Sequence, residues 1–318
     1  MTRASASEQL RPAEARHPSV TVVVPTRDRP ELLARAVASV LGQRYAGEIE
    51  CLVVFDQSPV RLPSLAAPPG RRLRSLANDR APGLAGARNA GAFAAEGDVL
   101  AFLDDDDEWL PDKVELQLEA LRARPEAVLA SCGIEVRYGR RRRARVPASD
   151  VLTFADLLAA RHAEIHPSTF LLPRATFFER IGLVDEHIPG SYAEDYEWLL
   201  RATRVGTIVC VRRPLVRIYW HRSSFFAARW RTIVSALTYL LERYPEFERD
   251  GRGLARIYGQ LAFAHAAAGD RGEARRWAGR ALRLSRRQLR AYLALLVSTR
   301  LVRAETLLRL AHLAGRGI

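Results

Sequence analysis

The sequence is poor in cysteine, with three among 318 residues, and it contains no long apolar run. Cys51, Cys132 and Cys210 lie in or beside apolar, strand-like segments, and their odd number and wide spacing argue against a disulfide framework or a cysteine metal site. No stretch of about 18 apolar residues is present, so no membrane span is expected. Residues 1–18 lack the apolar core of a secretory signal and are expected to be a disordered tail. These absences favour a reducing, cytoplasmic setting.

Lysine is almost absent, since Lys113 is the single lysine and arginine supplies nearly all of the positive charge behind a net charge of +13. An excess of positive charge can attract nucleic acid, anionic lipid or phosphorylated substrates. Genome composition alone can produce the same bias, and the arginine run at 140–143 is typical of a solvated hairpin turn. We therefore expect no nucleic-acid partner.

Short apolar strands alternate with amphipathic helices in the first part of the chain. Strands are predicted at 19–25, 50–55 and 97–103, and helices at 28–43, 84–95 and 111–124. This alternation predicts an α/β fold with a mostly parallel sheet. Ligands bind outside the carboxyl ends of the strands in such a sheet, and both Asp56 and residues 104–107 directly follow predicted strands.

Four consecutive aspartates, Asp104–Asp107, end the apolar stretch VLAFL. Adjacent carboxylates repel one another and are costly to desolvate, so their position at the end of a buried strand needs an explanation. Mg²⁺ or Mn²⁺ takes hard oxygen ligands and bridges them to phosphates, which would offset the repulsion. A solvated acidic turn before the next helix is the alternative, and the run alone does not decide between the two.

Four motifs follow one another along the chain: VVVPTRDRPELLARAVASVLGQ, LVVFDQS, GLAGARNAGAFAAEGDVLAFLDDDDEW and AEDYEWLLR. Together they resemble the bacterial family 2 glycosyltransferases with the GT-A fold, over about residues 19–225. The resemblance implies a Rossmann-like domain and a divalent metal, Mn²⁺ or Mg²⁺. It also implies inverting transfer of a sugar from a UDP-, dTDP- or GDP-sugar to an acceptor hydroxyl, in cell-surface polysaccharide, glycolipid or metabolite glycosylation.

The resemblance also assigns roles to individual residues. Asp195 matches the catalytic base, with Glu194 as its acidic neighbour, while Asp106 matches a metal ligand and His221 a late histidine that closes over metal and diphosphate. The residues implied on the donor side are Pro25, Thr26, Arg27, Asp56, Arg88, Asp104 and Asp105. A shift of one residue in the acidic run is left open.

Some positions depart from the family pattern, and several have plainer explanations. Arg27-Asp28 replaces the usual tyrosine-asparagine, and Gln57 stands where glycine is common, which leaves the base and the sugar open. The acidic pair could simply suit the start of the helix YEWLLRA, where negative charge is favoured. His166, in HPST, is interpreted as structural or acceptor-side.

Two other functions remain open at this stage. One is a nucleotidyltransferase or phosphohydrolase that uses the same acidic cluster. The other is a decayed transferase that acts as a nucleotide- or membrane-binding module.

Residues 231–318 are rich in alanine, leucine and arginine and are predicted to be helical. We therefore divide the chain into a tail (1–18), a GT-A domain (19–230) and a helical region (231–318). A helical hairpin is expected to turn at Gly269-Asp270, and residues 286–313 predict a basic amphipathic helix. Such a helix can lie on an anionic membrane surface, which would place the protein peripherally at the inner face of the cell membrane, although packing on the catalytic domain is the alternative.

Overall fold

The computed structural model describes residues 17–139, 141–219 and 229–313, so nearly all of the expected tail lies outside the described residues. Within these ranges, ten strands form one sheet with the main order β3-β2-β1-β4-β9-β6-β10-β5, while β7 pairs with β6 and β8 with β10. The strands are β1 Val20–Thr26, β2 Ile49–Phe55, β3 Arg71–Ala77, β4 Val99–Phe102, β5 Glu108–Trp109, β6 Ala127–Tyr138, β7 Arg141–Arg145, β8 Val151–Leu152, β9 Leu171–Pro173 and β10 Thr207–Tyr219.

The sheet is parallel across β3, β2, β1 and β4 and becomes mixed beyond β4. β9 runs antiparallel between β4 and β6, and β10 is again parallel to β6. The carboxyl ends of β1, β2 and β4 therefore meet at one edge, where the amino end of β9 also lies. The expected α/β fold with a Rossmann-like sheet is confirmed.

Alternating side chains of the strands fill two hydrophobic layers, which explains why the VVV run of β1 is buried on both faces. Val22 and Val24 pack into the layer beneath α1 and α3, whereas Val23 faces the layer formed with α2 and α6. The helices before the C-terminal region are α1 Pro30–Leu41, α2 Leu84–Ala94, α3 Lys113–Arg122, α4 Phe154–Ala159, α5 Arg174–Thr176 and α6 Glu194–Val205, with a short helical turn, η1, at Pro167–Thr169.

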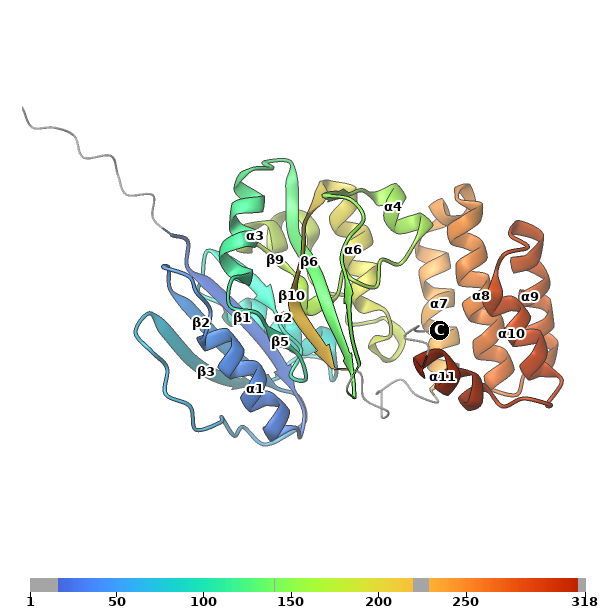
Figure 1. Cartoon of the computed structure of the whole chain (residues 1–318), viewed down its shortest axis with the longest axis horizontal. Coiled ribbons are helices and arrows are strands. Elements are labelled where there is room, and N and C mark those ends of the chain that lie inside the picture. Colours follow the sequence, from blue (N-terminus) through green and yellow to red (C-terminus); the bar gives the residue numbers. More distant parts are fainter. Residues whose placement is uncertain (1–16, 140, 220–228, 314–318) are drawn as a thin grey trace, which may run out of the picture.

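The C-terminal helices stand side by side at one end of the molecule (Figure 1). They are α7 Trp230–Arg243, α8 Gly251–Ala267, α9 Arg271–Leu284, α10 Leu289–Ser298 and α11 Ala304–Leu313. α7 joins the core through Tyr244, whose hydroxyl donates to Glu197 Oε1 of α6 at 2.8 Å. α8 and α9 form the expected hairpin, with Gly269 at a φ of +88°. The single helix expected over residues 286–313 is wrong, because α10 ends at Ser298 and α11 begins at Ala304. Among the described residues, no helix is both long and apolar enough to cross a bilayer.

Candidate active site

A cavity of about 1580 Å³ opens at the carboxyl edge of the sheet. Thr26 ends β1, Asp56 follows β2, and the acidic run 104–107 follows β4, so three strand ends supply one wall. The opposite wall comes from segments 160–166 and 186–195 and from side chains of α8 and α10. The position agrees with the rule that α/β sheets bind ligands beyond the carboxyl ends of their strands.

Asp105 and Asp106 are paired with the segment that follows β1. Thr26 Oγ1 donates to Asp105 Oδ2 at 2.8 Å, and Arg29 Nη1 lies 3.3 Å from Asp105 Oδ1 and 3.0 Å from Asp106 Oδ2. Burial raises the pKa of Asp105 to about 6, although the hydrogen bond from Thr26 opposes this. These contacts hold the ends of β1 and β4 together across the sheet.

Asp104 and Asp107 face the other way, toward the turn that precedes β9. Arg88 Nη2 donates to Asp104 Oδ1 at 2.8 Å, and the Ser168 hydroxyl donates to Asp107 Oδ2 at 2.6 Å. Ser168 Oγ also accepts from the backbone N–H of Asp104 at 3.0 Å. The acidic run therefore sends its side chains in two directions, and each carboxylate has a partner of its own.

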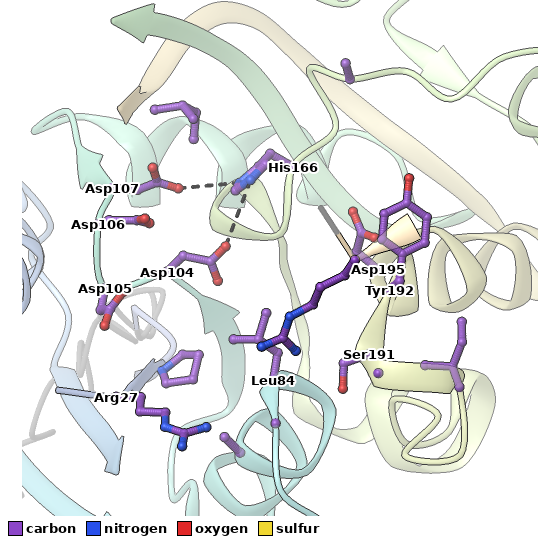
Figure 2. Close-up of a pocket in the computed structure, with 18 of the residues that line it drawn as sticks. Arg27, Leu84, Asp104, Asp105, Asp106, Asp107, His166, Ser191, Tyr192 and Asp195 are labelled. Atoms are coloured by element: carbon purple, nitrogen blue, oxygen red, sulfur yellow. Dashed lines mark ion pairs between the residues drawn. The ribbon is translucent and has the colours of Figure 1, made fainter. Parts of the chain in front are cut away.

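His166 lies between Asp104 and Asp107 (Figure 2). Its Nε2 is 3.9 Å from Asp104 Oδ2 and its Nδ1 is 3.5 Å from Asp107 Oδ2, and one ligand atom of each residue falls within 4.8 Å of the others. Burial lowers the pKa of His166, which favours the neutral imidazole that binds metals. Burial and the neighbouring Asp106 and Asp104 raise the pKa of Asp107. Two carboxylates and an imidazole form a donor set that fits Mn²⁺ or Mg²⁺.

The acidic pair at the start of α6 divides between two arginines. Arg161 Nη2 lies 3.0 Å from both carboxylate oxygens of Asp195, and Asp195 lines the cavity. Although burial raises the pKa of Asp195, Arg161, His166 and Arg88 together hold it below its usual value, so the carboxylate is ionised at neutral pH.

Glu194 points away from the cavity toward Arg88, whose Nη1 donates to Glu194 Oε1 at 2.6 Å. Burial raises the pKa of Glu194 to about 7. Arg88 itself is 3% exposed and lies behind the cavity wall, where it links Glu194 to Asp104. It is held there because α2 packs directly on the sheet: a Cβ on Gly91 would come within 2.3 Å of the Val23 side chain.

Asp56 is buried at the far end of the same wall. Its carboxylate accepts from Asn78 Nδ2 at 2.8 Å and from the backbone N–H of Gly83, at the start of α2, at 3.1 Å. Both partners fix the side chain at the strand end, where it lines the cavity.

Three non-glycine residues that line the cavity have left-handed backbone conformations. The φ angles are 51° at Asp28, 50° at Gln57 and 53° at Ser191. A conformation of this kind costs about 1–3 kcal/mol and is common at functional sites. The positive φ of Gln57 is a conformation that glycine adopts most easily, which agrees with the glycine that the family resemblance implied at this position.

Most of the residues predicted from the sequence meet in this cavity, which is lined by Pro25, Thr26, Arg27, Asp56, Asp104, Asp105, Asp106 and Asp195. Arg88 and Glu194 lie behind its wall, and His221 lies outside the described residues. Sequence reasoning missed Arg161 and Ser168 and did not place His166 with the acidic run. The HPST segment, residues 166–169, was the available signal for His166 and Ser168. It places a histidine and two hydroxyl groups directly before a short strand, where side chains can reach a site at the edge of the sheet.

The comparisons with known proteins agree with this geometry. The model of "Glycosyl transferase family 2" matches residues 21–179, half of the chain. The chain belongs to glycosyl transferase family 2. The matched segment runs from the second residue of β1 past the end of β9, and so contains every residue of the acidic run together with Asp56 and His166.

Family 2 relatives extend the similarity beyond the matched segment. An uncharacterized glycosyltransferase of Rickettsia prowazekii is 27% identical over 220 residues, which cover 64% of this chain and 64% of the relative. The chain therefore spans less than two thirds of that relative's length.

Two solved structures share the fold. They are TarS residues 1–349 of S. aureus in complex with UDP-GlcNAc (TM-score 0.58, 15% identity, 94% of this chain and 92% of that chain) and the mannosyltransferase PcManGT of Pyrobaculum calidifontis in complex with GDP-Man and Mn²⁺ (TM-score 0.56, 19% identity, 93% and 88%). The expected GT-A fold is confirmed.

Proposed function

We propose that this protein transfers a sugar from a nucleoside diphosphate sugar to an acceptor hydroxyl, with inversion at the anomeric carbon. One observation carries the proposal: a single cavity contains a cluster suited to a divalent cation and, across from it, an ionised carboxylate, Asp195. An inverting transfer needs one base and one displacement, and no enzyme nucleophile. UDP-, dTDP- and GDP-sugars are the candidate donors, and polysaccharide, glycolipid or a metabolite is the candidate acceptor.

The donor is proposed to bind along the strand-end wall. Pro25, Thr26, Arg27 and Asp56 lie at the ends of β1 and β2 and would contact the base, with Asp104 and Asp105 toward the ribose and the diphosphate. The fixed carboxylate of Asp56 suits recognition of a base edge, because it already accepts hydrogen bonds from N–H donors.

The cation is proposed to bind at the acidic run. Asp106 and His221 stay the predicted ligands from the family resemblance, and the group of Asp104, Asp107 and His166 adds a second candidate set. A bound Mn²⁺ or Mg²⁺ would neutralise negative charge that develops on the departing diphosphate. Arg29 pairs with Asp105 and Asp106 here, and its side chain is 38% exposed, so a cation would compete with a partly solvated partner.

Asp195 is proposed to accept the proton from the acceptor hydroxyl as its oxygen attacks the anomeric carbon. Arg161 orients the carboxylate through both oxygens and keeps it ionised. Glu194, together with Arg88, is proposed to position the start of α6 relative to the acidic run, since Arg88 connects the two segments.

A panel of nucleotide sugars tests the proposal. The native protein is expected to melt at a higher temperature with one donor only when Mn²⁺ or Mg²⁺ is present, because a ligand that binds the folded state stabilises it. Turnover should release nucleoside diphosphate only when an acceptor is supplied, and the product should have the inverted anomeric configuration by NMR. Nucleotide binding without turnover on any acceptor would favour a binding module instead. Release of nucleoside monophosphate together with sugar 1-phosphate would favour a phosphohydrolase, and release of sugar 1-phosphate with the nucleotidyl group passed to the acceptor would favour a nucleotidyltransferase.

We further propose that residues 19–230 form the catalytic domain and that residues 231–318 form a helical region. We also propose that the protein works in the cytoplasm, where its three free, buried cysteines would stay reduced. α10 exposes Leu289, Tyr292 and Leu296 on one face, and these residues are 59%, 46% and 39% exposed. Arginines 286 and 287 are exposed just before it, so peripheral contact with anionic membrane is proposed through this helix.

A further inference from the structure

The cavity extends past Asp195 to a wall that comes from the C-terminal helices. Arg256 and Gln260 of α8 and Arg290 of α10 line it there, next to Arg161 and Tyr192. In Figure 2, Tyr192 and Asp195 lie across the cavity from Arg27 and Asp105. The cavity thus has a strand-end half, proposed for the donor, and a helix half on the far side of the proposed base.

Three guanidinium groups gather in the helix half. Arg161 and Arg256 both lie over the Tyr196 ring, with Cζ 5.9 Å and 5.3 Å from its centroid. Arg256 Nη2 donates to the Tyr196 hydroxyl at 2.7 Å, while its Nε is buried without a hydrogen-bond partner. Arg290 makes no ion pair or hydrogen bond among the described residues, and burial together with the nearby Arg256 lowers its pKa.

The two halves of the cavity therefore differ in charge. The strand-end half carries Asp56 and the four aspartates of the acidic run against Arg27 and Arg29, so carboxylates are in excess there and suit a cation. In the helix half, Asp195 is the one carboxylate paired with these arginines among the described residues, so two positive charges are left over. Like charges in a partly buried site are costly unless an anion completes it.

We infer that the helix half is an acceptor subsite for a phosphate or diphosphate group. The inference rests on the proposed function and adds the chemical class of the acceptor. Arginine presents a planar fork of donors that matches phosphate oxygens, and the Nε of Arg256 and the free guanidinium of Arg290 supply such donors. A phosphate bound there would place a nearby hydroxyl of the same molecule next to Asp195.

The experiment measures binding by calorimetry to the full chain that has been saturated with Mg²⁺ and the nucleoside diphosphate selected by the donor panel. The probes are glycerol 3-phosphate, glycerol, and geranyl diphosphate as a soluble lipid-type diphosphate. We expect at least one phosphorylated probe to bind and glycerol not to bind. Binding of glycerol 3-phosphate would indicate a soluble phosphate ester, and binding of geranyl diphosphate alone would indicate a lipid-borne diphosphate.

Arg290→Gln and Arg256→Gln should each weaken that binding by about 10–100-fold, the loss expected for a charge-assisted hydrogen bond. The Arg290→Lys variant keeps the positive charge but loses the planar fork of donors, so its affinity for the probe should lie between those of wild type and Arg290→Gln. Arg275→Gln is the matched control. It removes the same positive charge, but from an exposed position on α9 that does not line the cavity. Melting temperatures confirm that each variant is folded, and among the described residues Arg290 makes no ion pair or hydrogen bond whose loss should unfold it.

Affinity for the nucleoside diphosphate is measured separately in every variant and should not change. The subsite is overturned if neither phosphorylated probe binds, if Arg290→Gln binds like Arg275→Gln, or if the nucleoside diphosphate displaces the probe from the wild type. If no nucleotide binds, the proposed function fails; the phosphate titrations of the variants, run without nucleotide, still decide the subsite.

Discussion

Replacing Asp195 by asparagine keeps the size of the side chain but removes its ability to accept a proton at neutral pH. The wild-type carboxylate is held by Arg161 at 3.0 Å from both oxygens and borders the cavity. Loss of a general base typically costs 10²–10⁴-fold in rate, equivalent to about 3–5 kcal/mol of activation free energy. We expect a fall in kcat of that size, with donor and metal affinity nearly unchanged because Asp195 lies away from the strand-end wall.

A fall in stability could imitate this result, because the substitution also breaks the pair with Arg161. Removing one partner of a buried pair costs about 3–5 kcal/mol, but the Arg161 side chain is 35% exposed and water screens its charge, so the cost here should be well below that range. Asp185→Asn is a matched control: Asp185 accepts from the Tyr239 hydroxyl at 2.5 Å and lies outside the cavity. The two variants should differ strongly in kcat.

The assay couples release of nucleoside diphosphate to a spectrophotometric signal, at saturating donor and acceptor. Glu194→Gln should lose less activity than Asp195→Asn, because Glu194 acts through Arg88 and does not line the cavity. If Asp195→Asn stays within a few-fold of wild type while Glu194→Gln is inactive, the wrong carboxylate has been named. If both variants stay active, the mechanism assigned to this acidic pair fails.

Three further changes test other parts of the site. Asp106→Asn should weaken Mn²⁺-dependent nucleotide binding by at least 10–100-fold in calorimetry, the loss that even an outer-shell partner of a metal causes; unchanged binding would leave only the set that includes His166. Arg161→Met should raise the pKa of Asp195, so that the acidic limb of kcat/KM moves to higher pH, and an unmoved limb would show that Arg161 does not set it. Lys113 is fully buried, its Nζ has no hydrogen-bond partner among the described residues, and burial lowers its pKa from 10.5 to about 7. The unfolded chain therefore binds more protons at this lysine, so its contribution to stability should rise with pH between these values, whereas the three buried cysteines, whose pKa values burial raises, act in the opposite direction. Urea titrations should show that the unfolding free energy of wild type minus that of Lys113→Met rises across this range, and a flat difference would refute the shift.

The first half of the fold could be predicted because its signals are local. The β-branched runs before Thr26 and Asp56 and the amphipathic pattern of α1 fix strands and helices without help from the rest of the chain. β3 was not predicted, because its residues are half-exposed at the sheet edge and have no apolar run. β5, β8 and β9 are two or three residues long and exist only through pairing with distant strands.

The site shows the same division between local and long-range information. The acidic run and Asp195, which line one cavity, could be singled out from the sequence because the motifs that contain them are continuous. His166 is 59 residues beyond Asp107, and only the pairing of β9 with β4 brings its turn to the same strand end. Arg161 precedes Asp195 by 34 residues, in a segment without regular structure, so nothing in its neighbourhood marks it as a partner.

The acidic run is tolerated because four different segments supply its partners. Arg88 comes from α2, Thr26 from β1, Arg29 from the residue before α1, and Ser168 from η1. These contacts offset the cost of burial and repulsion only in part, since burial still raises the pKa of Asp105 to about 6, and burial with the neighbouring Asp106 and Asp104 raises that of Asp107 well above its usual value. Ionising the run in the folded chain therefore still costs free energy, and a cation that binds it would recover that cost. It follows that metal binding and stability should be coupled at this strand end, with Mn²⁺ raising the melting temperature most at a pH where all four carboxylates are ionised.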